Sequence, residues 1–248
     1  MTALLALDFD GVICDALEEC ALVSWLGEHE PPAGLTGPEL LAAVPAGFVD
    51  RFRVVRNYSR LLEHFVVAHE PGSGDLATQA EFDAVFAALP EARVRAFHAA
   101  ATAARQRLRE AEPDFWFGLH TLYPGIPQLL RRFGESTVVV TAKDAESVRA
   151  ILAWHGMGST VAEVFGEISA KADVVLEVAR RRGIDPGQVL FVDDNLTNAL
   201  RVGQVGAAAR WAQWGYQTPE HRRAAAQAGV VPLLLDDLGE LVPAGRRA

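Results

Sequence analysis

The chain begins with an apolar run that ends in two acids, Leu4-Leu5-Ala6-Leu7-Asp8-Phe9-Asp10-Gly11-Val12. Such a run is typical of a buried parallel strand, and parallel α/β sheets carry their chemistry at the carboxyl ends of the strands. Because side chains alternate along a strand, Asp8 and Asp10 are predicted to point to the same side. Gly11 permits a sharp turn and a close approach of a ligand. Two neighbouring acids favour the binding of a cation. The alternative interpretation is an ordinary strand end at which both acids are solvated.

Four further runs rich in apolar and β-branched residues predict more strands of the same sheet. They are Thr137–Val140, Val189–Val192, Ala207–Trp211 and Val230–Leu235. Segments with apolar residues at helical spacing separate them, namely Pro124–Phe133, Ala145–Trp154, Ala170–Arg182, Leu196–Val202 and Pro219–Ala228. This alternation predicts an α/β fold with a doubly wound, Rossmann-like parallel sheet.

Residues 15–118 follow a different pattern. They are rich in alanine and helical in character, with breaks such as Pro71-Gly72-Ser73-Gly74. We interpret them as a helical domain inserted after the first strand. The predicted organisation is therefore a core domain of residues 1–14 and 119–242, the helical insertion of residues 15–118, and a flexible tail of residues 243–248.

Composition narrows the range of partners. The chain has 248 residues, a formal net charge of −9 and a pI near 5.3, which disfavours nucleic acid or an anionic membrane as the main ligand. No run approaches the roughly 20 apolar residues of a membrane span, and the N-terminus lacks a basic leader. The spacing of Cys14 and Cys20 matches neither a zinc site nor a redox pair, so both are expected to be buried thiols. We expect a cytoplasmic protein.

Candidate anion-binding groups come after the second predicted strand. Thr141 ends that strand, so its hydroxyl and the next backbone amides, starting at Ala142, could hold phosphate oxygens. Lys143 and Lys171 are the two lysines in a chain whose other basic residues are arginines, which suggests positions that need a compact ammonium, although chance is the alternative. Lys171 opens a predicted helix, where it could point at an anion or lie exposed on the surface.

A second pair of acids, Asp193 and Asp194, comes directly after the predicted strand Val189–Val192. Together with Asp8 and Asp10, these acids would place four carboxylates at neighbouring strand ends. Without a counter-ion they would repel one another strongly, and ligation by oxygen alone selects Mg²⁺. We therefore expect Mg²⁺ to bind at the carboxyl ends of these strands.

The order and spacing of these groups resemble the haloacid dehalogenase-like hydrolases. Asp8 to Val12 match the first family motif, Thr141 the second, Lys171 the third, and Asp193-Asp194 with Asn198 the fourth. Asn198 departs from the family pattern, in which an acid is common there. The stretch Leu122 to Pro127 is similar to the segment that returns from the helical cap in the phosphoglycolate phosphatase and β-phosphoglucomutase branch, so the insertion is expected to be a cap.

The resemblance implies a role for each matched residue. Asp8 would be the nucleophile that forms an aspartyl-phosphate, and Asp10 the general acid and base. Thr141 and Lys171 would hold the transferring oxygens, with Gly11 and Ala142 as further contacts of the substrate. The implied Mg²⁺ ligands are Asp8, the backbone carbonyl of Asp10, and Asp193 or Asp194.

The acid at position 10 discriminates between branches of the family. Dehalogenases lack an acid two residues after the nucleophile, so the resemblance implies a phosphatase that acts on a small phosphate ester. A phosphomutase has the same core and stays as the alternative, and a catalytically silent binding module is the third interpretation. The sequence is compatible with a monomer or a homodimer.

Substrate choice is expected to lie in the cap. Arg53, Arg56 and Arg60 are spaced to share a helical face and could bind a second anionic group of the substrate, although a solvated, ion-paired face is the alternative. Trp211, Trp214 and Tyr216 lie at or just after the end of a predicted strand and could border the pocket or simply pack.

Overall fold

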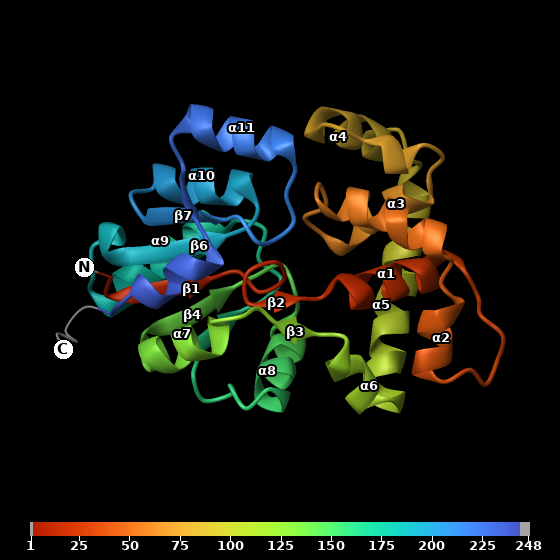
Figure 1. Ribbon diagram of the computed structural model, residues 1–248, viewed down its shortest axis with the longest axis horizontal. Helices are drawn as coiled ribbons and strands as arrows, with labels where there is room; N and C mark the ends of the chain where they lie inside the picture. The colour runs from red at the N-terminus through yellow and green to blue at the C-terminus, as the bar shows by residue number, and fades with distance from the viewer. Residues whose placement is uncertain (1, 244–248) are drawn as a thin grey trace. The chain divides into compact units, whose positions relative to one another are not determined.

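The computed structural model describes residues 2–243, which divide into two compact units (Figure 1). Unit 1 comprises Met1–Asp15 and Leu122–Ala248, and unit 2 comprises Ala16–Thr121. Residues 244–248 of the predicted tail lie outside the described residues. Pro243, which was also assigned to that tail, instead pairs with Thr2 in an isolated parallel bridge.

Unit 1 is built on a six-stranded sheet in which every neighbouring pair is parallel. In spatial order its strands are β5 (Glu163–Phe165), β4 (Thr137–Val140), β1 (Leu4–Leu7), β6 (Val189–Asp193), β7 (Ala208–Ala212) and β8 (Val231–Leu233). The predicted fold class is confirmed. The sequence pattern missed β5 because this edge strand has three residues, all only partly buried, and so lacks an apolar run.

Strand β1 lies in the middle of the sheet, between β4 and β6. From β4 the chain continues to the edge strand β5, and it then crosses over to β6, β7 and β8 on the other side of β1. The strand order therefore reverses at β1. In a doubly wound sheet, the crevice outside the carboxyl ends of the strands at such a reversal is where ligands bind.

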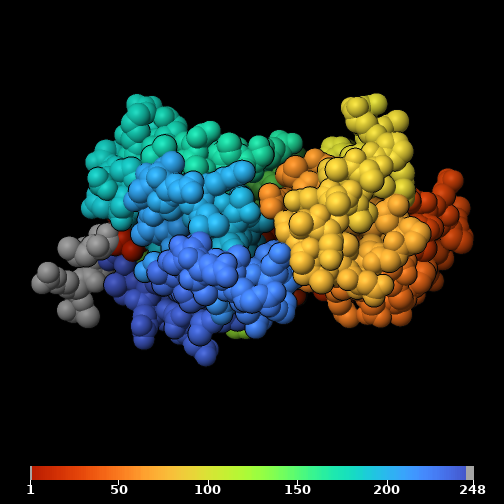
Figure 2. Space-filling view, turned by 90° about the horizontal axis from the view of Figure 1, so that it is seen from above, coloured from red at the N-terminus to blue at the C-terminus, as the bar shows by residue number. Residues whose placement is uncertain are grey.

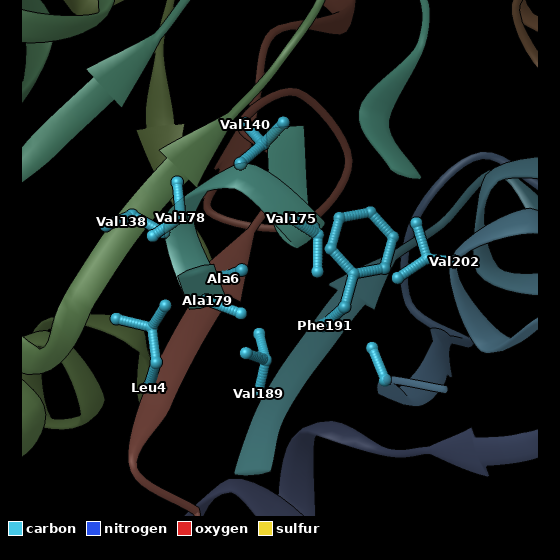
Figure 3. Close-up of a cluster of buried hydrophobic side chains, with 11 residues drawn as sticks. Leu4, Ala6, Val138, Val140, Val175, Val178, Ala179, Val189, Phe191 and Val202 are labelled. Atoms are coloured by element: carbon cyan, nitrogen blue, oxygen red, sulfur yellow. The ribbon is translucent and has the colours of Figure 1, made fainter. Parts of the chain in front are cut away.

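Five helices accompany the sheet: α7 (Ile126–Phe133), α8 (Ala145–Trp154), α9 (Lys171–Arg182), α10 (Leu196–Gln204) and α11 (Pro219–Ala228). Figure 3 shows the core beneath α9, where alternate residues of the three central strands meet apolar side chains of the helix. Leu4, Val138 and Val189 belong to the strands, and Val175 and Val178 to α9. This packing fixes the start of α9 above the carboxyl ends of the strands.

Helix α11 contributes little to the core, since Ala225 is its one buried residue. It forms part of the outer surface of unit 1 in Figure 2, where it is blue. Within residues 2–243, no helix combines the length and the apolar character that a membrane crossing requires.

Unit 2 consists mainly of helices. Its helices are α1 (Leu17–Glu28), α2 (Gly37–Ala43), α3 (Ala46–Arg56), α4 (Gln79–Ala87), α5 (Glu91–Ala111) and α6 (Pro113–Gly118), with a 3₁₀ helix over Leu62–His69 and another over Ser73–Asp75. The chain leaves unit 1 after β2 (Cys14–Asp15) and returns through β3 (Thr121–Leu122), and these strands pair with each other.

A buried ion pair ties α1 to α5 in unit 2. Glu19 is fully buried, and its Oε1 and Oε2 atoms accept hydrogen bonds from Arg105 Nε and Nη2 at 2.6 and 3.0 Å. Trp116 of α6 donates to the same carboxylate through Nε1 at 3.3 Å. A buried carboxylate is costly unless it is paired, and Arg105 and Trp116 supply the partners that Glu19 needs.

Candidate active site

The register of the sheet brings the ends of three strands together. Leu7 of β1 pairs with Val192 of β6 and with Val139 of β4, so Asp8 comes level with Asp193 on one side. The amide of Asp8 donates to the carbonyl of Val192 at 3.0 Å and extends this pairing beyond the strand. Acids from two strands that are far apart in the chain therefore meet at the carboxyl ends of these strands.

Beyond β1 the chain turns sharply, and the structure corrects one part of the prediction here. The amides of Val12, Ile13 and Cys14 all donate to the carbonyl of Phe9, and Gly11 has φ +84°. The sharp turn at Gly11 is confirmed. However, β1 ends at Leu7, so strand alternation does not extend to Asp8 and Asp10.

Lys171 joins two of the acids. Its Nζ atom lies 2.7 Å from Asp8 Oδ2 and 2.8 Å from Asp193 Oδ2, and its side chain is 4% exposed. Lys171 is the first residue of α9. The packing of α9 on the central strands places this ammonium at their carboxyl ends. The surface-lysine alternative is therefore excluded.

The pKa values of Lys171 and Asp193 are both raised in this cluster. Burial alone would lower the pKa of Lys171, but the attraction of Asp193 and Asp8 outweighs it and raises this pKa above its ordinary value. Burial, reinforced by the neighbouring Asp8, raises the pKa of Asp193 to about 6 despite the opposing effect of Lys171. Lys171 therefore stays protonated and supplies a permanent positive charge beside Asp8.

Asp10 faces the other lysine. Its Oδ2 atom lies 3.5 Å from Lys143 Nζ, and the Lys143 side chain is 2% exposed. The Oδ1 atom of Asp10 is buried and has no hydrogen-bond partner among residues 2–243. A buried carboxylate oxygen without a partner is unusual and is suited to a proton or a ligand.

Thr141 comes directly after β4 and is buried. Its amide donates to Phe165 of β5 at 2.9 Å, and its Oγ1 atom accepts from the amide of Lys143 at 3.2 Å. These bonds fix the turn that contains Ala142. Asp144 then caps α8 by accepting from the amide of Ser147 at 2.8 Å.

Asp193 and Asp194 differ in their surroundings. Asp193 accepts at Oδ1 from the amide of Asn195 (2.7 Å) and at Oδ2 from Lys171 (2.8 Å) and from Asn198 Nδ2 (3.1 Å). Asp194 Oδ2 accepts from the amide of Tyr216 at 2.7 Å. Asn198, where the family pattern often has an acid, thus serves here as a hydrogen-bond donor to Asp193.

Three of these acids could hold a metal ion. One carboxylate oxygen each from Asp8, Asp193 and Asp194 lies within 4.8 Å of the other two. A cluster of carboxylate oxygens suits hard divalent cations such as Mg²⁺. The excess of negative charge at the cluster, which Lys171 only partly offsets, is the physical reason to expect a cation here.

In unit 2 the predicted arginine face is wrong. Helix α3 ends at Arg56, so Arg60 lies beyond it. The Arg53 side chain is 60% exposed and ion-pairs with Asp50 at 3.5 Å. Arg56 is buried, donates to the Ser59 carbonyl at 3.3 Å and lies over a phenylalanine ring. Helical spacing alone could not show that the apolar neighbours of Arg56 enclose it.

Sequence reasoning underrated the residues at and after the end of β7. Trp211 is fully buried and donates from Nε1 to the carbonyl of Asp194 at 2.7 Å, and Trp214 Nε1 donates to the carbonyl of Val12 at 3.1 Å. The pattern suggested either a pocket border or simple packing. In the structure these side chains bond to the backbone of the two acid-bearing turns.

The carboxyl ends of the parallel strands thus carry two pairs of acids, one threonine and two buried lysines. The chain belongs to the haloacid dehalogenase-like hydrolase family, whose model matches residues 2–201. The matched range includes both pairs of acids, Thr141 and both lysines. No curated protein matches the chain.

Several solved structures share the fold. A predicted phosphoglycolate phosphatase from Haemophilus somnus 129PT is 19% identical, with a TM-score of 0.60 over 96% of this chain and 97% of that one. A predicted phosphatase from Clostridium acetobutylicum is 13% identical, with a TM-score of 0.59 over 97% and 100%. A hydrolase from Pseudomonas syringae is 12% identical, with a TM-score of 0.58 over 98% and 100%. At these identities the likeness supports the fold alone.

Proposed function

We propose that the chain is a Mg²⁺-dependent phosphatase that hydrolyses a small phosphorylated metabolite. The observation that carries this proposal is the contact of a buried, positively charged Lys171 with Asp8 at the carboxyl end of β1. An ammonium beside a carboxylate nucleophile attracts a phosphate dianion, which the carboxylate alone would repel. The phosphatase names of the Haemophilus and Clostridium structures agree with the proposal.

In the first half-reaction, a carboxylate oxygen of Asp8 attacks phosphorus, and the bond from phosphorus to the leaving oxygen breaks. Asp10 gives its proton to that oxygen, and Lys171 and Thr141 hold the transferring phosphoryl oxygens. The amide of Ala142 and the backbone at Gly11 are further candidate contacts of the substrate. The product is an aspartyl-phosphate on Asp8.

In the second half-reaction, Asp10 removes a proton from water, which attacks the same phosphorus. The bond between phosphorus and Asp8 breaks, and inorganic phosphate leaves. The buried Oδ1 atom of Asp10, which has no partner within residues 2–243, supports its assignment as the group that gives and takes the proton. Lys143, close to Oδ2, orients the carboxylate.

Mg²⁺ would be held by Asp8, the backbone carbonyl of Asp10 and Asp194. When bound, it neutralises the repulsion between the nucleophile and the phosphate. Asp193 is fully buried and accepts hydrogen bonds from three donors, one of them the Lys171 ammonium, so we assign the direct contact with the metal to Asp194. Asp193 then acts by holding Lys171 in place.

In this proposal, unit 2 is a cap domain that selects the substrate. Arg53 is our candidate for a contact with a distal anionic group, since its guanidinium is exposed. Arg56, the other sequence candidate, is buried within unit 2 and would need to rearrange before it could bind a substrate.

A panel of phosphorylated metabolites, assayed for phosphate release with Mg²⁺ and with EDTA, tests the proposal. We expect at least one ester to be hydrolysed, with activity lost in EDTA and restored by excess Mg²⁺. Activity that survives exhaustive chelation would contradict the metal role. Isomerisation of a hexose phosphate with little phosphate release would assign the chain to the phosphomutases instead.

A further inference from the structure

The carboxylate of Asp194 lies between two glycines. A Cβ atom added to Gly11 would lie 2.2 Å from Asp194 Oδ2, and one added to Gly215 would lie 2.4 Å from Asp194 Cβ and 2.7 Å from Oδ2. The Gly215 position would also come within 2.3 Å of the Gly11 carbonyl oxygen. Real Cβ contacts are essentially never this short, so both positions must lack a side chain for Asp194 to keep its place.

Hydrogen bonds hold Asp194 at both its side chain and its backbone. The amide of Tyr216 donates to Asp194 Oδ2 at 2.7 Å, and Trp211 Nε1 donates to the Asp194 carbonyl at 2.7 Å. One bond fixes the carboxylate and the other fixes the backbone of the same residue. A carboxylate on a two-bond side chain would otherwise sample several rotamers.

The same segment is anchored to the turn after β1. Trp214 Nε1 donates to the carbonyl of Val12 at 3.1 Å, and the hydroxyl of Tyr216 donates to Asp15 Oδ1 at 3.2 Å. This turn carries Asp8 and Asp10. The residues 214–216 thus connect the acids of the β1 turn to the acid next to the end of β6.

We propose that residues 214–216 are a positioning segment that sets the Asp194 carboxylate against the Asp8 turn before a metal ion binds. The inference rests on the proposed function for the presence of that ion. Gly215 leaves space for the Asp194 side chain, and the amide of Tyr216 donates to the Asp194 carboxylate. Trp214 donates to the carbonyl of Val12. Groups that orient metal ligands typically change metal affinity by about 10-fold to 100-fold when they are altered.

Gly215→Ala is the sharpest test, with Mn²⁺ alone as the probe and its binding measured by electron paramagnetic resonance and by calorimetry. We expect the Kd for Mn²⁺ to rise about tenfold or more, since the new methyl must displace Asp194 or the Gly11 carbonyl. Gly239→Ala is the matched control, because Gly239 has open space around it in the same unit. That variant should bind Mn²⁺ within about twofold of the parent. An unchanged Kd in folded Gly215→Ala would overturn the inference.

Trp214→Phe covers the case in which Gly215→Ala fails to fold. It removes the Nε1–H donor and keeps an aromatic ring, so the fold is retained, and the Kd for Mn²⁺ should rise about threefold or more with an unchanged far-UV circular dichroism spectrum. An unchanged Kd in this folded variant would equally overturn the inference.

A double-mutant cycle separates positioning from general damage. In an Asp194→Asn background, Gly215→Ala should weaken the remaining Mn²⁺ binding by less than about twofold, because the group it positions is already altered. An equal loss in both backgrounds would overturn the inference. A parent protein that binds no Mn²⁺ at all would instead overturn the metal site of the proposed function, and this inference would fall with it.

Discussion

The Nζ atom of Lys171 lies 2.7 Å from the Oδ2 atom of Asp8, at the carboxyl end of the central strand. The two residues are far apart in the chain, and they meet because α9 packs over β4 and β6, on either side of β1. The same ammonium also contacts Asp193. The buried ammonium of Lys171 thus holds the carboxylates of Asp8 and Asp193 close together.

Asp8→Asn should abolish turnover while leaving the fold intact. Asparagine has nearly the same shape but is not a nucleophile, so phosphate release should fall by at least about a thousandfold. Asp173→Asn changes an exposed acid of α9 and serves as the control. Activity within about tenfold of the parent, in protein free of contaminating phosphatase, would contradict the assignment of Asp8.

Lys171→Met should destabilise unit 1, because it leaves Asp8 and Asp193 facing each other in a buried site without their counter-ion. Loss of one partner of a buried ion pair costs about 3 to 5 kcal/mol. Urea unfolding at neutral pH will measure the loss in this variant. The same change in an Asp193→Asn background should cost at least about 1 kcal/mol less. Equal losses in both backgrounds would show that the ion pair is not the cause.

Asp10→Asn should slow both half-reactions, since one carboxyl group acts first as the acid and then as the base. Rapid-quench measurements with an alkyl phosphate should show slow release of the alcohol and slow release of phosphate. With an aryl phosphate, whose leaving group needs little protonation, the first step should be affected less. A full-rate burst of alcohol from the alkyl ester would restrict Asp10 to the role of base.

Arg56→Ala should lower the stability of unit 2 by about 1 to 3 kcal/mol, because it leaves the Ser59 carbonyl without this donor and removes the packing on Phe65. Arg53→Ala, at an exposed ion pair, should change stability by less than about 0.5 kcal/mol. Thermal unfolding and KM are measured on both variants. A selective rise in KM for Arg56→Ala with unchanged stability would return Arg56 to a role in substrate binding.

The stability of unit 2 should fall as the pH drops below about 6.5, the ordinary pKa of histidine. Burial lowers the pKa of His69 to about 4 and outweighs the opposing effect of Glu28. The unfolded chain therefore binds a proton at pH values where the folded chain does not, and this favours unfolding between about pH 6.5 and pH 4. The expected loss is about 2 kcal/mol at about pH 5 relative to about pH 7.5.

Urea unfolding at about pH 7.5 and about pH 5 checks the histidine prediction. His69→Asn should remove most of this pH dependence, whereas His98→Asn, at an exposed position of α5, should keep it. A parent protein that is equally stable at both pH values would show that His69 takes up a proton without unfolding.

Local sequence patterns were sufficient for most of unit 1. The ranges of β4, α8 and α11 match their predicted ranges. For β4 and α8 the reason is that a continuous apolar run and helical periodicity report burial of a strand and of one helix face. The pattern failed at β5, where pairing with β4 rather than hydrophobicity makes the strand. It also failed at Arg56, whose burial depends on residues beyond the end of α3.

The polar groups at the strand ends can be predicted from local sequence, because an apolar run that ends in acids or threonine specifies both a buried strand and the polar groups at its carboxyl end. Which of these groups meet depends instead on long-range pairing and packing. The register of β1 against β6 brings Asp8 level with Asp193, and the two glycines at positions 11 and 215 leave room for Asp194. Such contacts join segments up to about two hundred residues apart, and local periodicity carries no information about pairing over that distance.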